Sequence, residues 1–484
     1  MLARAIVDEL RGIVGAEGII AERAALRTYE SDGLASYHET PELVVLPTTT
    51  AQVRGVVRVC HREGIPFVPR GSGTGLSGGA LPVAGGVVIS LARMREILEI
   101  DLPNQRIVVQ PGVINLWITQ RVAPHGYYYA PDPSSQQVCS IGGNVAENSG
   151  GAHCLKYGFT VNHVLGMKLV LADGELVELG GPALDSPGYD LPGIVVGSEG
   201  TLGIATEVTL RLLRKPEAVQ TALAAFGHTD AAGEAVSGII AAGIVPAAVE
   251  MMDRLAIAAA EAAVHADYPR DAGAVLLVEL DGPRIEVERQ LARVEAICRE
   301  AGATEWRLAH TDEERALMWK GRKSAFAAVG RISPNYIVQD GVIPRTALPE
   351  ILREIEELSR ERGLRVANVF HAGDGNLHPL VLYDQREPGA VERAEELAGE
   401  IIRRCVAHGG SITGEHGVGA DKKAYMPVMF TDADLATQQL VRCALDPDHL
   451  CNPTKVYPTP RLCGETPGPY HPHPLELAGV AERF

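Results

Sequence analysis

Two histidines and a Glu-His pair are the residues of this chain best suited to hold a metal ion and move a proton. The segment 368–379 reads NVFHAGDGNLHP, so His371 ends one apolar run, His378 begins the next, and Asp374-Gly375 lies at the turn between them. If this hairpin is symmetric, the two histidines lie opposite each other on one face, with Cβ atoms about 4.5–5.5 Å apart. Two imidazoles at that spacing can share one metal ion. The alternative is that two polar residues flank an ordinary turn.

The Glu-His pair lies between glycines in the segment 411–420, SITGEHGVGA. Glycine neighbours leave room for both side chains to enter a crowded site. Glu415 would add an anionic third ligand and leave an open position for substrate, as in catalytic zinc sites. His416, with an ordinary pKa of about 6.5, can act as a base at neutral pH. The alternative for this pair is an exposed loop.

Three glycine-rich segments in the first half could bind a long phosphate-containing ligand. The segment 73–78 matches the dinucleotide fingerprint G-x-G-x-x-G, but the residues after it cannot begin the helix that this fingerprint requires. Bare backbone amides still form a concave nest for phosphate oxygens, to which Arg70 adds a charged donor. The segments 131–151 and 197–204 repeat the pattern. One such segment could be a hairpin turn, but three favour a ligand with a pyrophosphate and a ring system.

Apolar spacing and turn signals predict the elements that must position these residues. The first half is expected to contain a helix over 52–63 and strands over 43–46, 66–69, 87–91, 107–110, 167–171, 176–179, 194–197 and 204–213. Composition changes at Arg214-Lys215-Pro216, after which helices are expected over 250–265, 284–301, 349–361 and 391–407, with strands over 275–280, 364–370 and 377–383. The chain is therefore predicted to be α+β. Its second half should form an antiparallel sheet with helices on one face.

The composition of the chain excludes several classes of function. The 484 residues include 44 Lys and Arg against 61 Asp and Glu, a net charge of −17, which disfavours binding to nucleic acids or anionic membranes. The eight cysteines form no C-x-x-C pair, so an iron–sulfur cluster within this chain is not expected. Their scatter favours free buried thiols in a reducing compartment. Residues 1–14 predict an amphipathic helix rather than a signal peptide, and no apolar run is long enough to span a membrane.

The glycine-rich segments resemble the FAD-binding half of the vanillyl-alcohol oxidase / p-cresol methylhydroxylase (PCMH) flavoproteins. Longer motifs narrow the resemblance to the FAD-linked D-2-hydroxy-acid dehydrogenases, above all to the glycolate oxidase type, over essentially the whole chain. These motifs include YYYAPDPSSQQVCSIGGNVAEN, RISPNY and RVANVFHAGDGNLHP. The resemblance implies a PCMH-type FAD-binding domain of two subdomains over 1–216 and a substrate-binding cap domain over 217–440. A C-terminal segment over 441–484 would return to the FAD domain.

The same resemblance implies which residues line the flavin. Thr74 stands where some members tether FAD to a His or Cys, so the FAD should be non-covalent. The expected flavin-binding residues are Arg70, Gly71, Ser72, Gly73, Thr74, Gly75, Leu76, Ser77, Pro131, Asp132, Ser134, Gly142, Gly143, Asn144, Ser149, Gly150, Gly151, Glu199, Gly200, Gly203, Ile204 and Asn452.

Roles for the catalytic residues also follow from the resemblance. The expected ligands of a divalent metal, zinc or manganese, are His371, His378 and Glu415, and His416 is the expected base. Asn376 would contact the substrate, and the guanidinium of Arg322 would hold its carboxylate. Hydroxyglutarate enzymes carry a Lys for a second carboxylate where this chain has Val338. That difference favours a small monocarboxylate such as glycolate or D-lactate.

The implied activity is FAD-dependent oxidation of a small D-2-hydroxy acid to the 2-oxo acid. Electrons would pass to an iron–sulfur partner or to quinone, in a complex with a second flavin-type subunit and an iron–sulfur subunit. The chain would be cytoplasmic, docked at the inner face of the membrane. Three alternatives remain at this point. They are a self-sufficient D-lactate or D-2-hydroxyglutarate dehydrogenase, a non-catalytic flavin subunit, and a sugar-nucleotide reductase, which would have no use for the two histidines.

Overall fold

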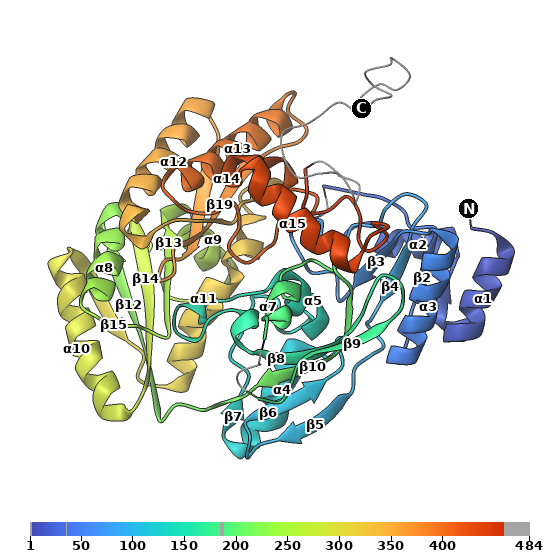
Figure 1. Cartoon of the computed structure of the whole chain (residues 1–484). Coiled ribbons are helices and arrows are strands. Elements are labelled where there is room, and N and C mark those ends of the chain that lie inside the picture. The colour runs from blue at the N-terminus through green and yellow to red at the C-terminus, as the bar shows by residue number, and fades with distance from the viewer. Residues whose placement is uncertain (1, 35, 184–187, 459–484) are drawn as a thin grey trace.

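The computed structural model describes residues 2–34, 36–183 and 188–458 (Figure 1). The chain begins with a small sheet in the order β1-β2-β4-β3, whose three longer strands are parallel to one another. Its strands are β1 (Ile19–Ile20), β2 (Leu43–Val45), β3 (Phe67–Arg70) and β4 (Val87–Ser90). Apolar residues of α1 (Arg4–Val14) and α3 (Thr50–Glu63) pack on this sheet. Both helices and the strands β2, β3 and β4 agree with the sequence predictions, whereas β1 was not predicted.

A second, five-stranded sheet is antiparallel throughout, in the order β5-β6-β10-β8-β9. Its strands are β5 (Ile97–Asp101), β6 (Arg106–Val109), β8 (Val164–Val170), β9 (Leu176–Gly180) and β10 (Ile204–Arg211). Its core is shared with α4 (Asn115–Val122), α5 (Ile141–Glu147) and α7 (Leu191–Val195). The strand expected over 194–197 is wrong, because residues 194 and 195 end α7 and residues 196 and 197 form a turn. Asp190 caps that helix by accepting a hydrogen bond from the amide of Gly193.

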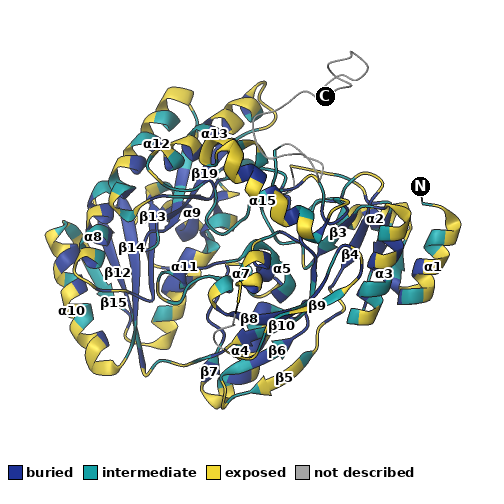
Figure 2. Cartoon of the chain, viewed as in Figure 1, coloured by how far each residue is buried: buried dark blue, intermediate teal, exposed yellow. Residues whose placement is uncertain are grey.

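The second half is built on an eight-stranded antiparallel sheet in the order β15-β12-β14-β13-β18-β19-β16, with β17 also paired to β19. The strands are β12 (Ala218–Phe226), β13 (Ala248–Asp253), β14 (Ala274–Gly282), β15 (Ala303–Leu308), β16 (Asn335–Val338), β17 (Gly341–Val342), β18 (Arg365–His371) and β19 (Asn376–Tyr383). Figure 2 shows β12, β13 and β14 buried along most of their length.

Helices cover both faces of this sheet, so the expectation of helices on one face is wrong. One face packs against α8 (Thr229–Ala241), α10 (Arg284–Glu300), α12 (Leu348–Arg362) and α13 (Ala390–Ala407). The other face packs against α9 (Arg254–Val264) and α11 (Asp312–Val329). Alternate residues of β12 show the division, because Phe226 belongs to the first core and Leu223 to the second. The predicted α+β class and antiparallel sheet are confirmed.

The helix expected over 250–265 begins too early. Residues 248–253 form β13, and α9 starts only after Asp253, whose side chain accepts a hydrogen bond from the amide of Ala256. The cause is that β13 is buried on both faces and lacks the polar alternation by which a strand is recognised. The error matters for function, because Glu250 lies on this strand directly opposite His371 of β18.

The last described residues return to the first sheet after α14 (Met426–Met429) and α15 (Asp432–Leu445). The amide of Phe67 donates to the carbonyl of Leu450, and the amide of Asn452 donates to the carbonyl of Phe67. The remaining short elements are α2 (Arg23–Leu26), α6 (Cys154–Tyr157), β7 (Tyr127–Tyr128) and β11 (Leu213–Arg214). The domain boundaries at 216 and 440 stay predictions.

Within the described ranges, six cysteines are buried free thiols, at positions 60, 139, 154, 298, 405 and 451. Cys443 is disulfide-bonded, so the expectation of free thiols is wrong at that position. Among the described helices, none combines the length and the apolar character needed to cross a membrane.

Candidate active site

A cavity of about 950 Å³ lies where the glycine-rich loops meet the eight-stranded sheet, called the cap sheet below. Its volume falls within the range of small-molecule and cofactor sites. One part of its wall is the loop after β3, the start of α5 and the segment 198–205. Another part comes from α11, β16 and the side chains of His378, Glu415 and His416. The loops expected to bind a flavin therefore share one cavity with His378, Glu415 and His416, whereas Arg322, His371 and Asn376 do not line it.

Most of the predicted flavin residues line this cavity. They are Arg70, Gly71, Ser72, Gly73, Thr74, Gly75, Leu76, Ser134, Gly142, Gly143, Asn144, Ser149, Glu199, Gly200, Gly203 and Ile204. The structure places the other six outside the lining: Ser77, Pro131, Asp132, Gly150, Gly151 and Asn452. Asn452 instead supports the lining, because its Nδ2 donates to the carbonyls of Gly79 and Glu199 at 2.8 and 2.6 Å.

Glycine is required in the loop after β3 for two separate reasons. Gly73 has a φ of +70°, in the left-handed region, and a Cβ there would overlap Nη2 of Arg70. A Cβ on Gly71 would overlap the hydroxyl of Ser140, which precedes α5. The loop is thus folded tightly against its own arginine and against the next glycine-rich segment.

The cavity wall carries polar atoms that suit a bound cofactor. The Oγ of Ser140 and the Nδ2 of Asn144 are buried, line the cavity and have no hydrogen-bond partner among the described residues. Buried polar groups are nearly always paired, so two unpaired atoms on residues that line one cavity favour a ligand site there. Together with the bare amides of the glycine loops, they fit FAD.

The two histidines of the hairpin lie on the same face but not directly opposite each other. His371 pairs with Asn376 and His378 pairs with Val369, so the histidines are diagonal neighbours rather than opposed. The turn occupies 372–375, which places position 376 opposite 371. The rings still approach to 5.1 Å between centroids. The spatial pairing is as expected, and the register is corrected by two residues.

Glu415 completes a compact donor group with these histidines. Its Oε1 lies 3.2 Å from Nε2 of His371 and 3.5 Å from Nε2 of His378. Although burial opposes ionisation, His371 and the other nearby imidazoles lower the pKa of Glu415 to about 2. Two imidazole nitrogens and one carboxylate form a donor set that suits zinc. A Cβ on Gly150 would lie 2.7 Å from Oε2 of Glu415, so the flavin-side loop packs directly against this group.

Glu250, which the sequence analysis did not single out as a site residue, binds the other side of His371. Its Oε1 lies 2.8 Å from Nδ1 of His371, and its Oε2 lies 2.6 Å from Nη2 of Arg322. A carboxylate on the second ring nitrogen orients a metal-binding histidine. Arg322 itself is buried and does not line the cavity. Its Nε makes no hydrogen bond within the described part of the chain.

His416 stacks on His378 inside the cavity. The two rings are 4.9 Å apart between centroids and within 3° of parallel. Burial lowers the pKa of His416 to about 4, so its ring is neutral and can accept a proton. Asn376 is buried nearby, and its Oδ1 has no partner among the residues described.

The chain matches two family models. One is described as the FAD binding domain and matches residues 41–180; the other, FAD linked oxidases, C-terminal domain, matches residues 215–456. The glycolate oxidase subunit GlcD of Escherichia coli K12 is 55% identical over 92% of this chain and 89% of that protein. The chain belongs to the FAD-linked oxidases. It is therefore an FAD-dependent oxidoreductase, as the sequence predicted.

More distant relatives within the FAD-linked oxidases carry related names. GlcD of Bacillus subtilis is 39% identical over 94% of this chain and 97% of that protein. The D-lactate dehydrogenase of Anaerostipes hadrus is 32% identical over 88% of this chain and 92% of that protein. Among solved structures, the 4-ethylphenol oxidase of Gulosibacter chungangensis has a TM-score of 0.77 at 19% identity over 94% of this chain and 96% of that one.

A substrate-bound p-cresol methylhydroxylase has a TM-score of 0.75 at 17% identity, over 93% of this chain and 96% of that one. At such identities the comparison with solved structures concerns the fold alone. It confirms the predicted PCMH-type architecture.

Proposed function

We propose that this enzyme oxidises a small D-2-hydroxy acid, glycolate or D-lactate, to the 2-oxo acid. The observation that carries the proposal is the single cavity that joins the flavin loops to His378, Glu415 and His416. The 55% identical relative is a glycolate oxidase subunit, and a 32% identical one is a D-lactate dehydrogenase, which supports this substrate class.

The flavin loops, the candidate metal ligands and His416 each have a role in this reaction. FAD, bound non-covalently by the glycine loops, supplies the acceptor for the hydride from the substrate carbon. His371, His378 and Glu415 would hold a zinc or manganese ion, whose charge polarises the substrate hydroxyl. His416, neutral in its buried position, takes the hydroxyl proton on a ring nitrogen.

The substrate carboxylate is held by buried donors. The Nε of Arg322 has no acceptor among the described residues and would bind the carboxylate once the side chain moves toward the cavity, which it does not line in this structure. Asn376 lies on the same hairpin as the two histidines and would position the hydroxy acid beside them. Val338 lines the cavity and offers no charge to a second carboxylate, which favours monocarboxylates.

We infer that the electrons leave through partner subunits. The relatives at 55% and 39% identity are both named as subunits, which supports assembly with other chains. The buried cysteines of the described residues are dispersed rather than grouped as cluster ligands. The partners proposed are a second flavin-type subunit and an iron–sulfur subunit, docked at the cytoplasmic face of the membrane.

The test of the substrate class is a dye-linked assay of the purified chain. Glycolate and D-lactate should reduce the dye faster than L-lactate or D-2-hydroxyglutarate. Val338→Lys should raise kcat/KM for D-2-hydroxyglutarate relative to glycolate, whereas Val338→Met, which adds length without charge, should not. Failure of the flavin-loaded chain to oxidise any of these acids would contradict the proposed function.

A further inference from the structure

The carboxylate of Asp340 accepts hydrogen bonds from the loop that carries Glu415 and His416. Asp340 lies between β16 and β17 and is fully buried. Its Oδ2 accepts hydrogen bonds from the Oγ1 of Thr413 at 2.6 Å and from the amides of Gly414 and His416, both at 2.9 Å. The amide of Glu415 donates to the same oxygen at 3.1 Å. Three consecutive backbone amides therefore converge on one side chain.

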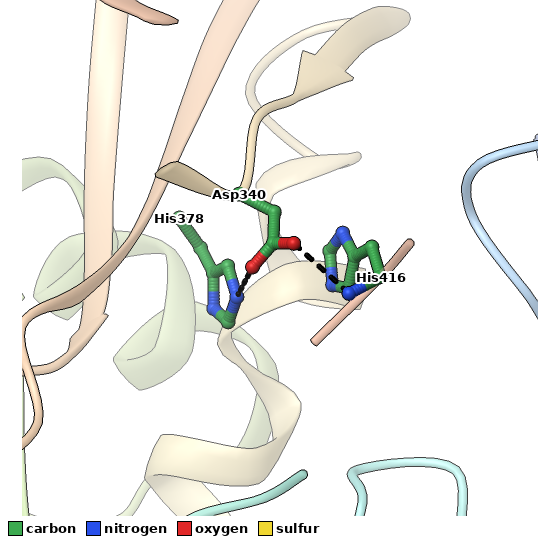
Figure 3. A group of neighbouring side chains, drawn as sticks. All are labelled: Asp340, His378 and His416. Atoms are coloured by element: carbon green, nitrogen blue, oxygen red, sulfur yellow. Dashed lines mark hydrogen bonds and ion pairs between the residues drawn. The ribbon is translucent and has the colours of Figure 1, made fainter. Parts of the chain in front are cut away.

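The same carboxylate also contacts the cap hairpin. Its Oδ1 lies 3.2 Å from Nε2 of His378, as Figure 3 shows, and the ammonium of Lys422 lies 3.5 Å from Oδ2. Lys422 is itself buried. A buried carboxylate needs such partners to remain charged without water. Asp340 is thus tied to both segments that supply the candidate metal ligands.

Two overlapping groups of side chains could hold a cation in this region. One is His371, His378 and Glu415; the other is Asp340, His378 and His416. The Oδ2 of Asp340 already accepts from three amides and a hydroxyl, more donors than a carboxylate oxygen has lone pairs. Coordination by this oxygen would leave those buried amides without an acceptor. The first group is the better ligand set, and Asp340 has another role.

We propose that Asp340 is a positioning residue, which shapes the 413–416 loop so that Glu415 and His416 enter the cavity. This inference rests on the proposed function for its kinetic consequence, though not for its structural one. Residues 413–416 belong to no helix or strand, so the amides of Gly414, Glu415 and His416 depend on the side chain of Asp340 for an acceptor. Without the carboxylate, the three amides would hydrogen-bond to water instead. The side chains of Glu415 and His416 would then change their orientation in the cavity.

The test compares Asp340→Asn with a matched buried control, Asp253→Asn, both as FAD-loaded proteins. Asp253 likewise accepts two backbone amides, those of Ala256 and Asn368, and among the described residues it has no hydrogen bond to the 413–416 loop and does not line the cavity. Hydrogen exchange of the peptide 411–420 should accelerate in Asp340→Asn only. In that variant kcat for glycolate should fall by about 100-fold, as for loss of a general base, with KM changed far less. Asp253→Asn should keep the wild-type kcat.

Unchanged exchange in peptide 411–420, or a kcat within about twofold of wild type, would overturn the proposal. If Asp340→Asn does not fold, Thr413→Val removes the hydroxyl that donates to Asp340 and that also accepts from the amide of Gly417. The amides of residues 414–416, read separately from that of Gly417, should then show a smaller acceleration of exchange, with a smaller fall in kcat. Unchanged hydrogen exchange in the Thr413→Val protein would also contradict the positioning role of Asp340. A wild-type protein that oxidises no hydroxy acid would refute the proposed function alone, because the exchange measurement needs no substrate.

Discussion

His153 is linked to Glu279 across the two halves of the chain, with Nε2 of the imidazole 3.1 Å from Oε1 of the carboxylate. His153 precedes α6 beside the flavin loops, whereas Glu279 lies on β14 of the cap sheet. The other ring nitrogen, Nδ1, lies 2.9 Å from Oδ2 of Asp132, and the ring stacks on Trp319. Although burial favours the neutral ring, Asp132 and Glu279 raise the pKa of His153 to about 10. A charged imidazolium therefore joins the flavin side to the cap.

This arrangement predicts a pH-dependent stability. Because the pKa of His153 rises from 6.5 in the unfolded chain to about 10 in the folded one, its stabilisation is complete below pH 6.5 and is lost as the pH rises through 10. His153→Gln should lower the free energy of unfolding by up to about 5 kcal/mol below pH 6.5 and by much less near pH 10. Urea unfolding across this range measures the difference. His125→Gln, at an exposed position, should show no such trend.

Removal of the proposed base should affect turnover but not flavin binding. His416→Ala is expected to lower kcat by about 10²–10⁴, the usual contribution of a general base. The FAD content, read from the absorbance of the purified protein, should equal that of wild type. His125→Ala serves as the control. A His416→Ala enzyme that retains wild-type kcat would remove this residue from the mechanism.

Metal content should depend on the hairpin histidines and not on the surface cluster. The structure contains another group of possible donors, Glu350, Glu354 and His408, at the surface. His371→Gln should abolish bound metal in elemental analysis and abolish turnover, whereas His408→Gln should change neither. Chelation of wild type should stop turnover and leave the flavin spectrum intact. Full activity in an extensively dialysed, metal-free sample would contradict the proposed metal site.

The flavin should depend on the fit of the glycine loop. Gly73→Ala places a Cβ at a positive φ and against Arg70, so the purified variant should contain much less FAD than wild type. Gly12→Ala, on exposed α1 with open space around its Cβ, should keep full FAD content. Acid precipitation of wild type should release all flavin to the supernatant. Yellow colour retained in the pellet would show a covalent bond and refute the inference from Thr74.

The elements and residues that sequence analysis found share a local signal. The hairpin of His371 and His378 was predictable because an Asp-Gly turn lies between two apolar runs. The glycine loops were predictable because consecutive backbone amides without side chains form a nest for phosphate oxygens. The register of the hairpin was not, since it depends on where the turn closes. The strand β13 was missed because burial on both faces removes the alternation that marks a strand.

The supporting residues of the site could not be found in the same way. Glu250 meets His371 only because β13 and β18 are neighbours in the sheet, and nothing in the sequence around either residue indicates that pairing. Asp340 likewise acts on a loop that is more than seventy positions away, with separations of 73 to 76 residues. Such contacts arise from tertiary structure, so they leave no periodic pattern or turn motif in the sequence.

The hydrogen bond from Asn452 to the carbonyl of Gly79 spans 373 positions of the chain. At a synthesis rate of about 5–20 residues per second, roughly 20–75 s separate the emergence of the two residues from the ribosome. The loop proposed to bind the flavin is thus synthesised well before the residue that supports it. Throughout that interval the nascent polypeptide lacks the two hydrogen bonds that Asn452 donates to the carbonyls of Gly79 and Glu199.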